Sequence, residues 1–102
     1  MKKRAQIALP RQKVSDFCRR HGIRKLSLFG SVLRDDFRKD SDVDVLVEFE
    51  PGKQVGMIRL AGMELELGEM IGRKVDLHTE GFLSRYFRDE VVAEAEVQYD
   101  SA

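Results

Sequence analysis

Two aspartates one residue apart, in the stretch SDVDVLVEF, are the residues of this sequence whose spacing points most directly to chemistry. Side chains alternate along a strand, so residues 42–49 divide between two faces. One face carries Asp42, Asp44, Leu46 and Glu48, and the other carries Val43, Val45, Val47 and Phe49. The apolar set predicts the core face, which leaves the two carboxylates outside the core, about 6–7 Å apart at Cα. A divalent cation would relieve their repulsion, and hard oxygen ligands favour Mg²⁺.

A third carboxylate follows in the stretch KVDLHT, where Asp76 lies between the apolar residues Val75 and Leu77. If a strand over 74–78 pairs with the strand over 42–49, Asp76 falls on the face that carries Asp42 and Asp44. Three carboxylates would then surround one or two metal ions. Two such ions can clamp the attacking and leaving oxygens of an in-line phosphoryl displacement.

A glycine–serine pair, Gly30-Ser31, ends the preceding apolar stretch and supplies the complementary half of a phosphoryl-transfer site. Glycine lets a backbone approach phosphates closely, and a strand end followed by a helix start exposes N–H groups that bind them. Each motif alone is a weak signal, but together, each at a strand edge, they are much more specific. The alternative is structural: Asp42 would cap a turn, and Asp44 and Asp76 would be exposed strand residues.

The elements that must position these residues follow from apolar periodicity and from Pro and Gly boundaries. The expected elements are a helix over 10–21, a strand over 24–29, a short helix over 31–37, a strand over 42–49, a helix over 54–71, a strand over 74–79, and a final helix or pair of helical turns over 81–99. This order predicts an α+β domain in which a small sheet is backed by helices.

Several residues of the two later helices are expected to pack into the core. Close packing against the sheet would explain Gly56, Gly62 and Gly68, and the core would be filled by Met57, Met63 and Met70. The final helix is expected to bury an amphipathic stripe of Phe82, Leu83, Tyr86, Phe87 and Val91.

The composition predicts a single cytoplasmic domain over residues 1–102, with a core over about 12–95. No apolar run reaches the roughly 20 residues of a membrane span, and the start of the chain does not resemble a signal peptide. Cys18 is the only cysteine and is expected to be a small apolar helix residue. Nine Lys or Arg residues and one Asp lie in residues 1–25. Since no aromatic residues interleave with them, direct nucleic-acid binding is not expected.

The stretch GSVLRDDFRKDSDVDVLVEF resembles the signature of the minimal nucleotidyltransferases of the DNA polymerase β-like superfamily. That signature is Gly-Ser, about ten residues, Asp-x-Asp at the start of a strand and a later third Asp, and the resemblance covers roughly residues 12–95. The usual form continues from Gly-Ser with x-Ala-Arg-Gly. This chain keeps the arginine, Arg34, but has Leu33 and Asp35 on either side of it.

The resemblance implies a mixed sheet with helices on one side and a site that binds a nucleoside triphosphate with two Mg²⁺ ions. Asp42 and Asp44 would be metal ligands, and Asp76 would complete the metal site and orient or deprotonate the acceptor hydroxyl. Gly30 and Ser31 would hold the β- and γ-phosphates. Arg34 would neutralise the leaving pyrophosphate, or it would be a surface arginine.

Stand-alone domains of this size are similar to the antitoxins of HEPN–MNT toxin–antitoxin pairs. The implied activity is transfer of AMP from ATP to a tyrosine of the partner HEPN ribonuclease. The lack of an acceptor-binding domain would fit an acceptor that is itself a protein. Two alternatives stay open: a catalytically weak antitoxin that masks its partner, and a small-molecule nucleotidyltransferase with a separate acceptor-binding subunit. A homo-oligomer is compatible with either.

Overall fold

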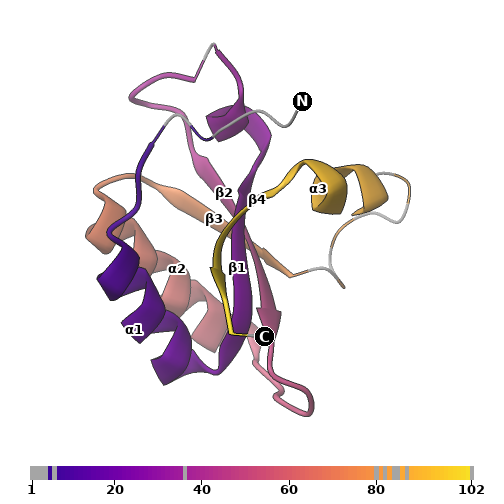
Figure 1. Ribbon diagram of the computed structural model, residues 1–102. Coiled ribbons are helices and arrows are strands. Elements are labelled where there is room, and N and C mark those ends of the chain that lie inside the picture. Colours follow the sequence, from indigo (N-terminus) through magenta and orange to yellow (C-terminus); the bar gives the residue numbers. More distant parts are fainter. Residues whose placement is uncertain are drawn as a thin grey trace.

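The computed structural model describes residues 5, 7–35, 37–79, 81, 83, 86 and 88–101. Its elements in chain order are α1 (Arg11–His21), β1 (Ile23–Phe29), a short 3₁₀ helix η1 (Gly30–Leu33), β2 (Val43–Phe49), α2 (Met57–Ile71), β3 (Val75–Thr79), α3 (Arg88–Glu94) and β4 (Glu96–Asp100) (Figure 1). The predicted order is confirmed as far as β3, although α2 begins at 57 rather than 54. The short helix predicted over 31–37 ends at Leu33, because Arg34 is already extended, with φ −104° and ψ 155°.

Four strands form one mixed sheet in the order β3-β2-β1-β4. The central strand β1 pairs antiparallel with β2 and with β4, whereas β2 and β3 run parallel. The parallel pair is joined through α2, as a parallel connection requires a crossover. The expected α+β fold with a small mixed sheet is therefore confirmed.

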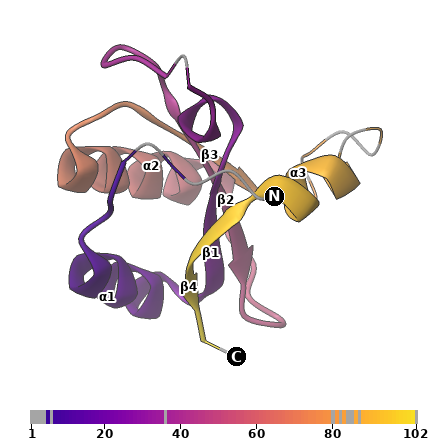
Figure 2. The same cartoon turned by 45° about the horizontal axis from the view of Figure 1, so that its top comes forward.

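The helices α1 and α2 cover one face of this sheet (Figure 2). Their buried side chains meet those of β1, β2 and β3 in the main core, which consists of Val14, Phe17, Cys18, Ile23, Leu26, Leu28, Val32, Leu33, Val43, Val45, Val47, Met63, Leu67 and Val75. The alternation predicted for residues 42–49 holds here, since Val43, Val45 and Val47 are fully buried. The opposite face of β2 is thus left for the carboxylates.

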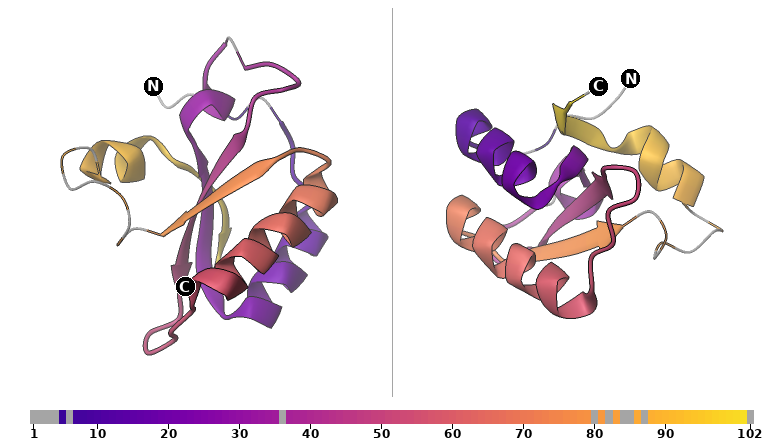
Figure 3. Two further views of the ribbon diagram at one scale, coloured as in Figure 1. Left: turned by 180° about the vertical axis from the view of Figure 1, so that it is seen from behind. Right: turned by 90° about the horizontal axis from the view of Figure 1, so that it is seen from below.

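The helix α3 lies on the other side of the sheet, which departs from the expectation of helices on one side only (Figures 1 and 3). A second, smaller cluster forms there from Phe29, Leu46, Leu83 and Ala95, with Val91 packed against it. Leu46 on β2 and Phe29 on β1 follow core residues directly, so their side chains point to the face of the sheet opposite the main core. These apolar side chains are buried only if another element packs on that face. The α3 region supplies it and forms one wall beside the carboxylate face.

The prediction of helix over 81–99 is wrong at its C-terminal end, where residues 96–100 form β4. The stretch AEAEV contains strong helix formers, which favour a helix when only local sequence is considered. The segment forms a strand instead because β1 would otherwise have an unpaired edge. β4 satisfies that edge, with Leu26 opposite Tyr99 and Leu28 opposite Glu96. Of the predicted amphipathic stripe, Leu83 is buried, Tyr86 is exposed, and Phe82 and Phe87 lie outside the described residues.

Part of the packing predicted for α2 is also wrong. Met63 is buried and Met70 packs against the core, but Met57 is exposed. A Cβ added at Gly68 would press on the Arg73 carbonyl, whereas one added at Gly56 or Gly62 would meet nothing within 4 Å. Gly56 and Gly62 face solvent rather than the sheet, so close packing within this chain does not explain them.

Cys18 has the structural role expected of it, and His21 links α1 to α2. Cys18 is fully buried, and burial raises the pKa of its thiol to about 12, so it is a poor nucleophile. His21 ends α1 and its Nε2 lies 2.9 Å from Glu66 Oε1 on α2. No helix of the described residues has the length and apolar character to cross a membrane.

A pH-dependent contribution to stability follows from the contacts between α1 and Glu66. Burial raises the pKa of Glu66, but the bonds from His21 and Arg20 outweigh it and leave that pKa below its ordinary value. A lowered folded-state pKa stabilises the fold above the unfolded-state pKa, and this contribution is lost as the pH falls through the folded-state pKa. We expect Glu66→Gln to lower the free energy of unfolding by up to about 1 kcal/mol at pH 6–7. In urea unfolding, the difference from wild type should shrink as the pH falls below the ordinary pKa of a glutamate; a difference independent of pH would contradict it.

Candidate functional site

Asp44 and Asp76 lie directly opposite each other on the parallel strands β2 and β3. Neighbouring strands are about 4.8 Å apart, so the two carboxylates stand on one face as immediate neighbours. The sequence prediction that these strands pair with Asp76 on the carboxylate face is confirmed. Burial raises the pKa of Asp76, and the negative charges of Asp42, Asp44 and Glu64 raise it further. The site therefore concentrates negative charge where a cation would be stabilising.

Asp42 lies just before β2, which begins at Val43, rather than within the strand. Its main-chain carbonyl accepts a hydrogen bond from the Ser31 hydroxyl at 3.3 Å. Its carboxylate Oδ2 is 3.9 Å from Lys74 Nζ, in the turn before β3. Asp42 thus lies at the end of the sheet where β2 and β3 begin, and its negative charge contributes to raising the pKa of Asp76.

Gly30 brings the turn after β1 against the Asp44 carboxylate. Its φ of +76° lies in the left-handed region, and a Cβ added there would overlap Asp44 Oδ2. Both constraints demand glycine. The two motifs recognised in the sequence, Gly-Ser and Asp-x-Asp, therefore meet in space. Register places them together too, since Phe29 pairs with Asp44.

Ser31 lies within the short helix η1, and Arg34 directly follows its last residue, Leu33. The Ser31 side chain is partly buried through its bond to the Asp42 carbonyl, and its own carbonyl accepts the Arg34 N–H at 2.9 Å. The Arg34 side chain is exposed. Ser31 is therefore tied to the carboxylate strand, whereas Arg34 points from the same turn into solvent.

Two further residues surround the site, and sequence reasoning assigned them no role. His78 Nε2 lies 3.4 Å from Asp44 Oδ1, and its ring packs edge-on against Phe29 at 5.2 Å. The adjacent Asp44 carboxylate raises the pKa of His78, and burial only partly opposes this. Glu64 on α2 accepts the Leu77 N–H at 2.7 Å and so holds the edge strand β3. Alternation along β3 placed His78 on the carboxylate face, but nothing in the sequence marked Glu64.

The donor chemistry of this face fits a hard divalent cation. In the described part of the chain, no three His, Cys, Asp or Glu side chains are already gathered closely enough to hold a metal ion. Asp42, Asp44 and Asp76 nevertheless offer oxygen ligands only, and two of them share one register position. Lys74 Nζ lies 3.9 Å from Asp42 Oδ2, and His78 Nε2 lies 3.4 Å from Asp44 Oδ1, so both contacts are longer than an ordinary charge-assisted hydrogen bond. A divalent cation bound here would contact the carboxylate oxygens directly, at shorter distances than Lys74 and His78 do.

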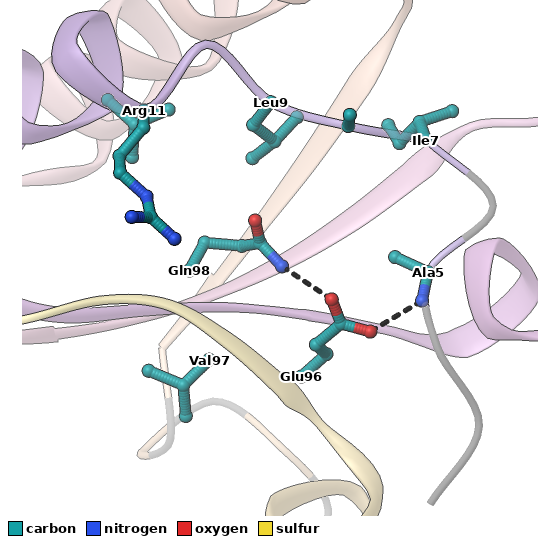
Figure 4. A pocket seen from close by; sticks show the side chains of 9 residues that line it. Ala5, Ile7, Leu9, Arg11, Glu96, Val97 and Gln98 are labelled. Carbon is teal, nitrogen blue, oxygen red and sulfur yellow. Dashed lines mark hydrogen bonds between the residues drawn. The ribbon is translucent and has the colours of Figure 1, made fainter.

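A cavity of about 390 Å³ lies elsewhere, between the N-terminal segment and the edge strand β4 (Figure 4). Its polar groups satisfy one another, since Glu96 accepts bonds from the Ala5 N–H at 2.5 Å and from Gln98 Nε2 at 3.0 Å. β4 and β3 are at opposite edges of the sheet. The cavity therefore does not belong to the carboxylate site.

Comparison with known proteins points to one family. Residues 11–98 match the model of the nucleotidyltransferase domain. A curated relative, "Putative protein adenylyltransferase MJ0435" of Methanocaldococcus jannaschii, is 33% identical over 85 residues, which cover 83% of this chain and 89% of the relative. A solved structure of a "putative minimal nucleotidyltransferase" is 39% identical, with a TM-score of 0.68 over 83% of this chain and 85% of that one.

A more distant match shows the same fold. It is a chain from the complex of tri-AMPylated Shewanella oneidensis HEPN toxin with MNT antitoxin. The identity is 20% and the TM-score is 0.66, over 88% of this chain and 69% of that chain.

The contact between Gly30 and Asp44 can be tested with a matched pair of glycines. Gly30 and Gly52 have φ values of +76° and +82°, but only a Cβ at Gly30 would meet a neighbour. We expect Gly52→Ala to cost about 1 kcal/mol of unfolding free energy through backbone strain, and Gly30→Ala to cost about 1–3 kcal/mol more through overlap with the carboxylate. Urea unfolding of both variants measures the difference.

The same pair in an Asp44→Ala background provides the control. There the extra cost of Gly30→Ala should disappear, because the carboxylate is gone. Equal costs for the two glycines in the wild-type background would contradict the contact.

Proposed function

Because the chain belongs to the nucleotidyltransferase domain family, we propose that it transfers AMP from ATP to a hydroxyl group of a partner protein, using Mg²⁺. The observation that carries this proposal is the register that sets Asp44 beside Asp76, with Gly30 against the Asp44 carboxylate. This register brings two carboxylates, the ligand type that Mg²⁺ prefers, and a glycine turn to one point of the sheet, which supports the proposal.

Each of the predicted residues has a role in binding the nucleotide. Gly30 and Ser31 hold the β- and γ-phosphates through the backbone of the turn and through the serine hydroxyl, which exchanges its 3.3 Å bond to the Asp42 carbonyl for one to a phosphate oxygen. Arg34, exposed just beyond η1, neutralises charge on the departing pyrophosphate. Asp42, Asp44 and Asp76 are the ligands for two Mg²⁺ ions, whose chemistry when bound is to neutralise the triphosphate.

Asp76 orients the acceptor hydroxyl and takes its proton. Asp76 lies beside Asp44 on the neighbouring strand, so an acceptor hydroxyl bound at this site meets its carboxylate. As the proton moves to Asp76, the acceptor oxygen forms a bond to the α-phosphorus. The bond from that phosphorus to the oxygen bridging the α- and β-phosphates breaks, and pyrophosphate leaves. Positioning and charge neutralisation account for most of the rate enhancement.

The acceptor in this proposal is a tyrosine of a HEPN toxin, and the chain acts in the cytoplasm as its antitoxin. The relative in M. jannaschii bears the name of a protein adenylyltransferase. The structurally similar complex from S. oneidensis pairs an MNT antitoxin with a HEPN toxin that carries AMP groups. Both support a protein hydroxyl, rather than a small molecule, as the acceptor.

Transfer of labelled AMP tests the proposal. The chain is incubated with α-³²P-ATP, Mg²⁺ and the HEPN toxin that the proposal names as its partner, and label on the HEPN protein is measured. We expect Asp44→Asn to reduce labelling at least about a hundredfold, because it removes a cation ligand at the centre of the site. Asp89→Asn, at an exposed position of α3, is the control and should label as wild type does.

Two results would contradict the proposal. One is the absence of label from wild type under conditions where the two proteins bind each other. The other is full protection of cells from the toxin by Asp44→Asn, which would indicate an antitoxin that acts by masking its partner.

A further inference from the structure

The face of α2 that points away from the sheet carries an apolar stripe; Figure 3 shows that no other described helix or strand covers this side of α2. Ile58 is 92% exposed and Leu65 is 72% exposed, and Ala61 and Gly62 lie exposed between them. These four residues recur at helical spacing and so share one face. A continuous apolar face of this kind on a charged surface marks an interface rather than scattered apolar residues.

Gly62 at the centre of this stripe has no explanation within the chain. It lies in the middle of α2, where glycine is the least favourable residue after proline. A Cβ added there would meet nothing within 4 Å. The absence of a side chain matters only if something outside the chain packs closely against the helix. The distance between two packed helices depends on the side chains at their contact, so a glycine at the crossing allows the closest approach.

The charges of α2 indicate what that occupant is. Arg59, in the first turn, is the only basic residue of α2, while Glu66 and Glu69 lie in its C-terminal half. This order runs against the preference of the helix macrodipole, which favours acidic residues near the N-terminus and basic residues near the C-terminus. An identical helix that runs antiparallel to α2 would place its acidic C-terminal half beside the basic N-terminal half of α2, so the two helices have complementary charges.

We propose that α2 pairs antiparallel with α2 of a second copy of this chain, with the stripe Ile58, Ala61, Gly62 and Leu65 at the interface. A two-fold axis near Ala61 and Gly62 sets Ile58 against Leu65 of the second copy. The same axis brings Arg59 beside Glu66 of the second copy, a carboxylate that is 34% exposed and that also accepts bonds from Arg20 and His21 of its own chain. Apolar pairing, close approach and charge pairing thus agree on one register, as a self-complementary two-fold interface requires.

This dimer is independent of the proposed catalytic activity. α2 covers the core face of the sheet, whereas Asp44 and Asp76 lie on the opposite face. Two copies joined through α2 therefore leave both carboxylate sites open. Substitutions in the stripe should change the oligomeric state without changing AMP transfer, so failure of one proposal can be told from failure of the other.

The test is the molar mass of the purified chain by sedimentation velocity at about 10–500 µM. We expect wild type to approach twice the 11.7 kDa of the chain as concentration rises. Ile58→Glu and Leu65→Glu should stay monomeric throughout. Val92→Glu makes the same kind of change at an exposed position of α3, and it should dimerise as wild type does. Circular dichroism checks that each variant is folded.

Gly62→Ala separates the interface from a role in the fold. If the surface is free, the substitution only favours the helix, so it raises the melting temperature and leaves the mass unchanged. In the proposed dimer the added methyl groups crowd the crossing, so the dissociation constant should rise at least about tenfold. Wild type that remains monomeric at about 500 µM, or a dimer that survives Ile58→Glu and Leu65→Glu, would overturn the proposal. So would capture of another protein by this stripe while the chain alone stays monomeric.

Discussion

The repulsion between Asp44 and Asp76 is the constraint on which the rest of this structure depends. Parallel strands with Val43 opposite Val75 must also set Asp44 opposite Asp76, because both strands alternate in step. Moving one strand by a residue would separate the acids only by turning valines of the core toward solvent. The apolar packing of α1 and α2 on one face therefore holds two like charges together on the other. Glu64 reinforces the arrangement by holding the Leu77 N–H at the sheet edge.

The turn at Gly30 and the wall formed by the α3 region complete the site around these acids. Gly30 fits against the Asp44 carboxylate only because it lacks a side chain and adopts a positive φ. Phe29 and Leu46 join the smaller cluster beside α3, so the carboxylate face is bounded without being covered. Lys74 contributes a positive charge beside Asp42, and the His78 ring lies beside Asp44. The result is a negatively charged face with a glycine turn at its border, which is the arrangement that the proposed nucleotidyl transfer requires.

Most of this arrangement could be predicted from the sequence, because its signals are local. Period-two alternation identified the core face of β2 and placed Asp76 on the carboxylate face, and Pro and Gly set the ends of α1. The features that were missed depend on partners distant in sequence. β4 forms because β1 has an open edge, and its helix-forming residues gave no sign of this. Glu64 matters only because α2 crosses over β3. Met57 and Gly62 were expected in the core, since periodicity alone does not fix which side of a glycine-containing helix faces the sheet.

The central claim is that Asp44 and Asp76 form one cation site, and Mn²⁺ binding measured by electron paramagnetic resonance in the presence of ATP tests it most directly. Mn²⁺ takes the same oxygen ligands as Mg²⁺ and is detected without any enzymatic turnover. We expect Asp44→Asn and Asp76→Asn each to weaken Mn²⁺ binding to the protein–ATP complex by at least about tenfold, while Asp89→Asn binds it as wild type does. Equal Mn²⁺ affinity in wild type and in both site variants would contradict the account.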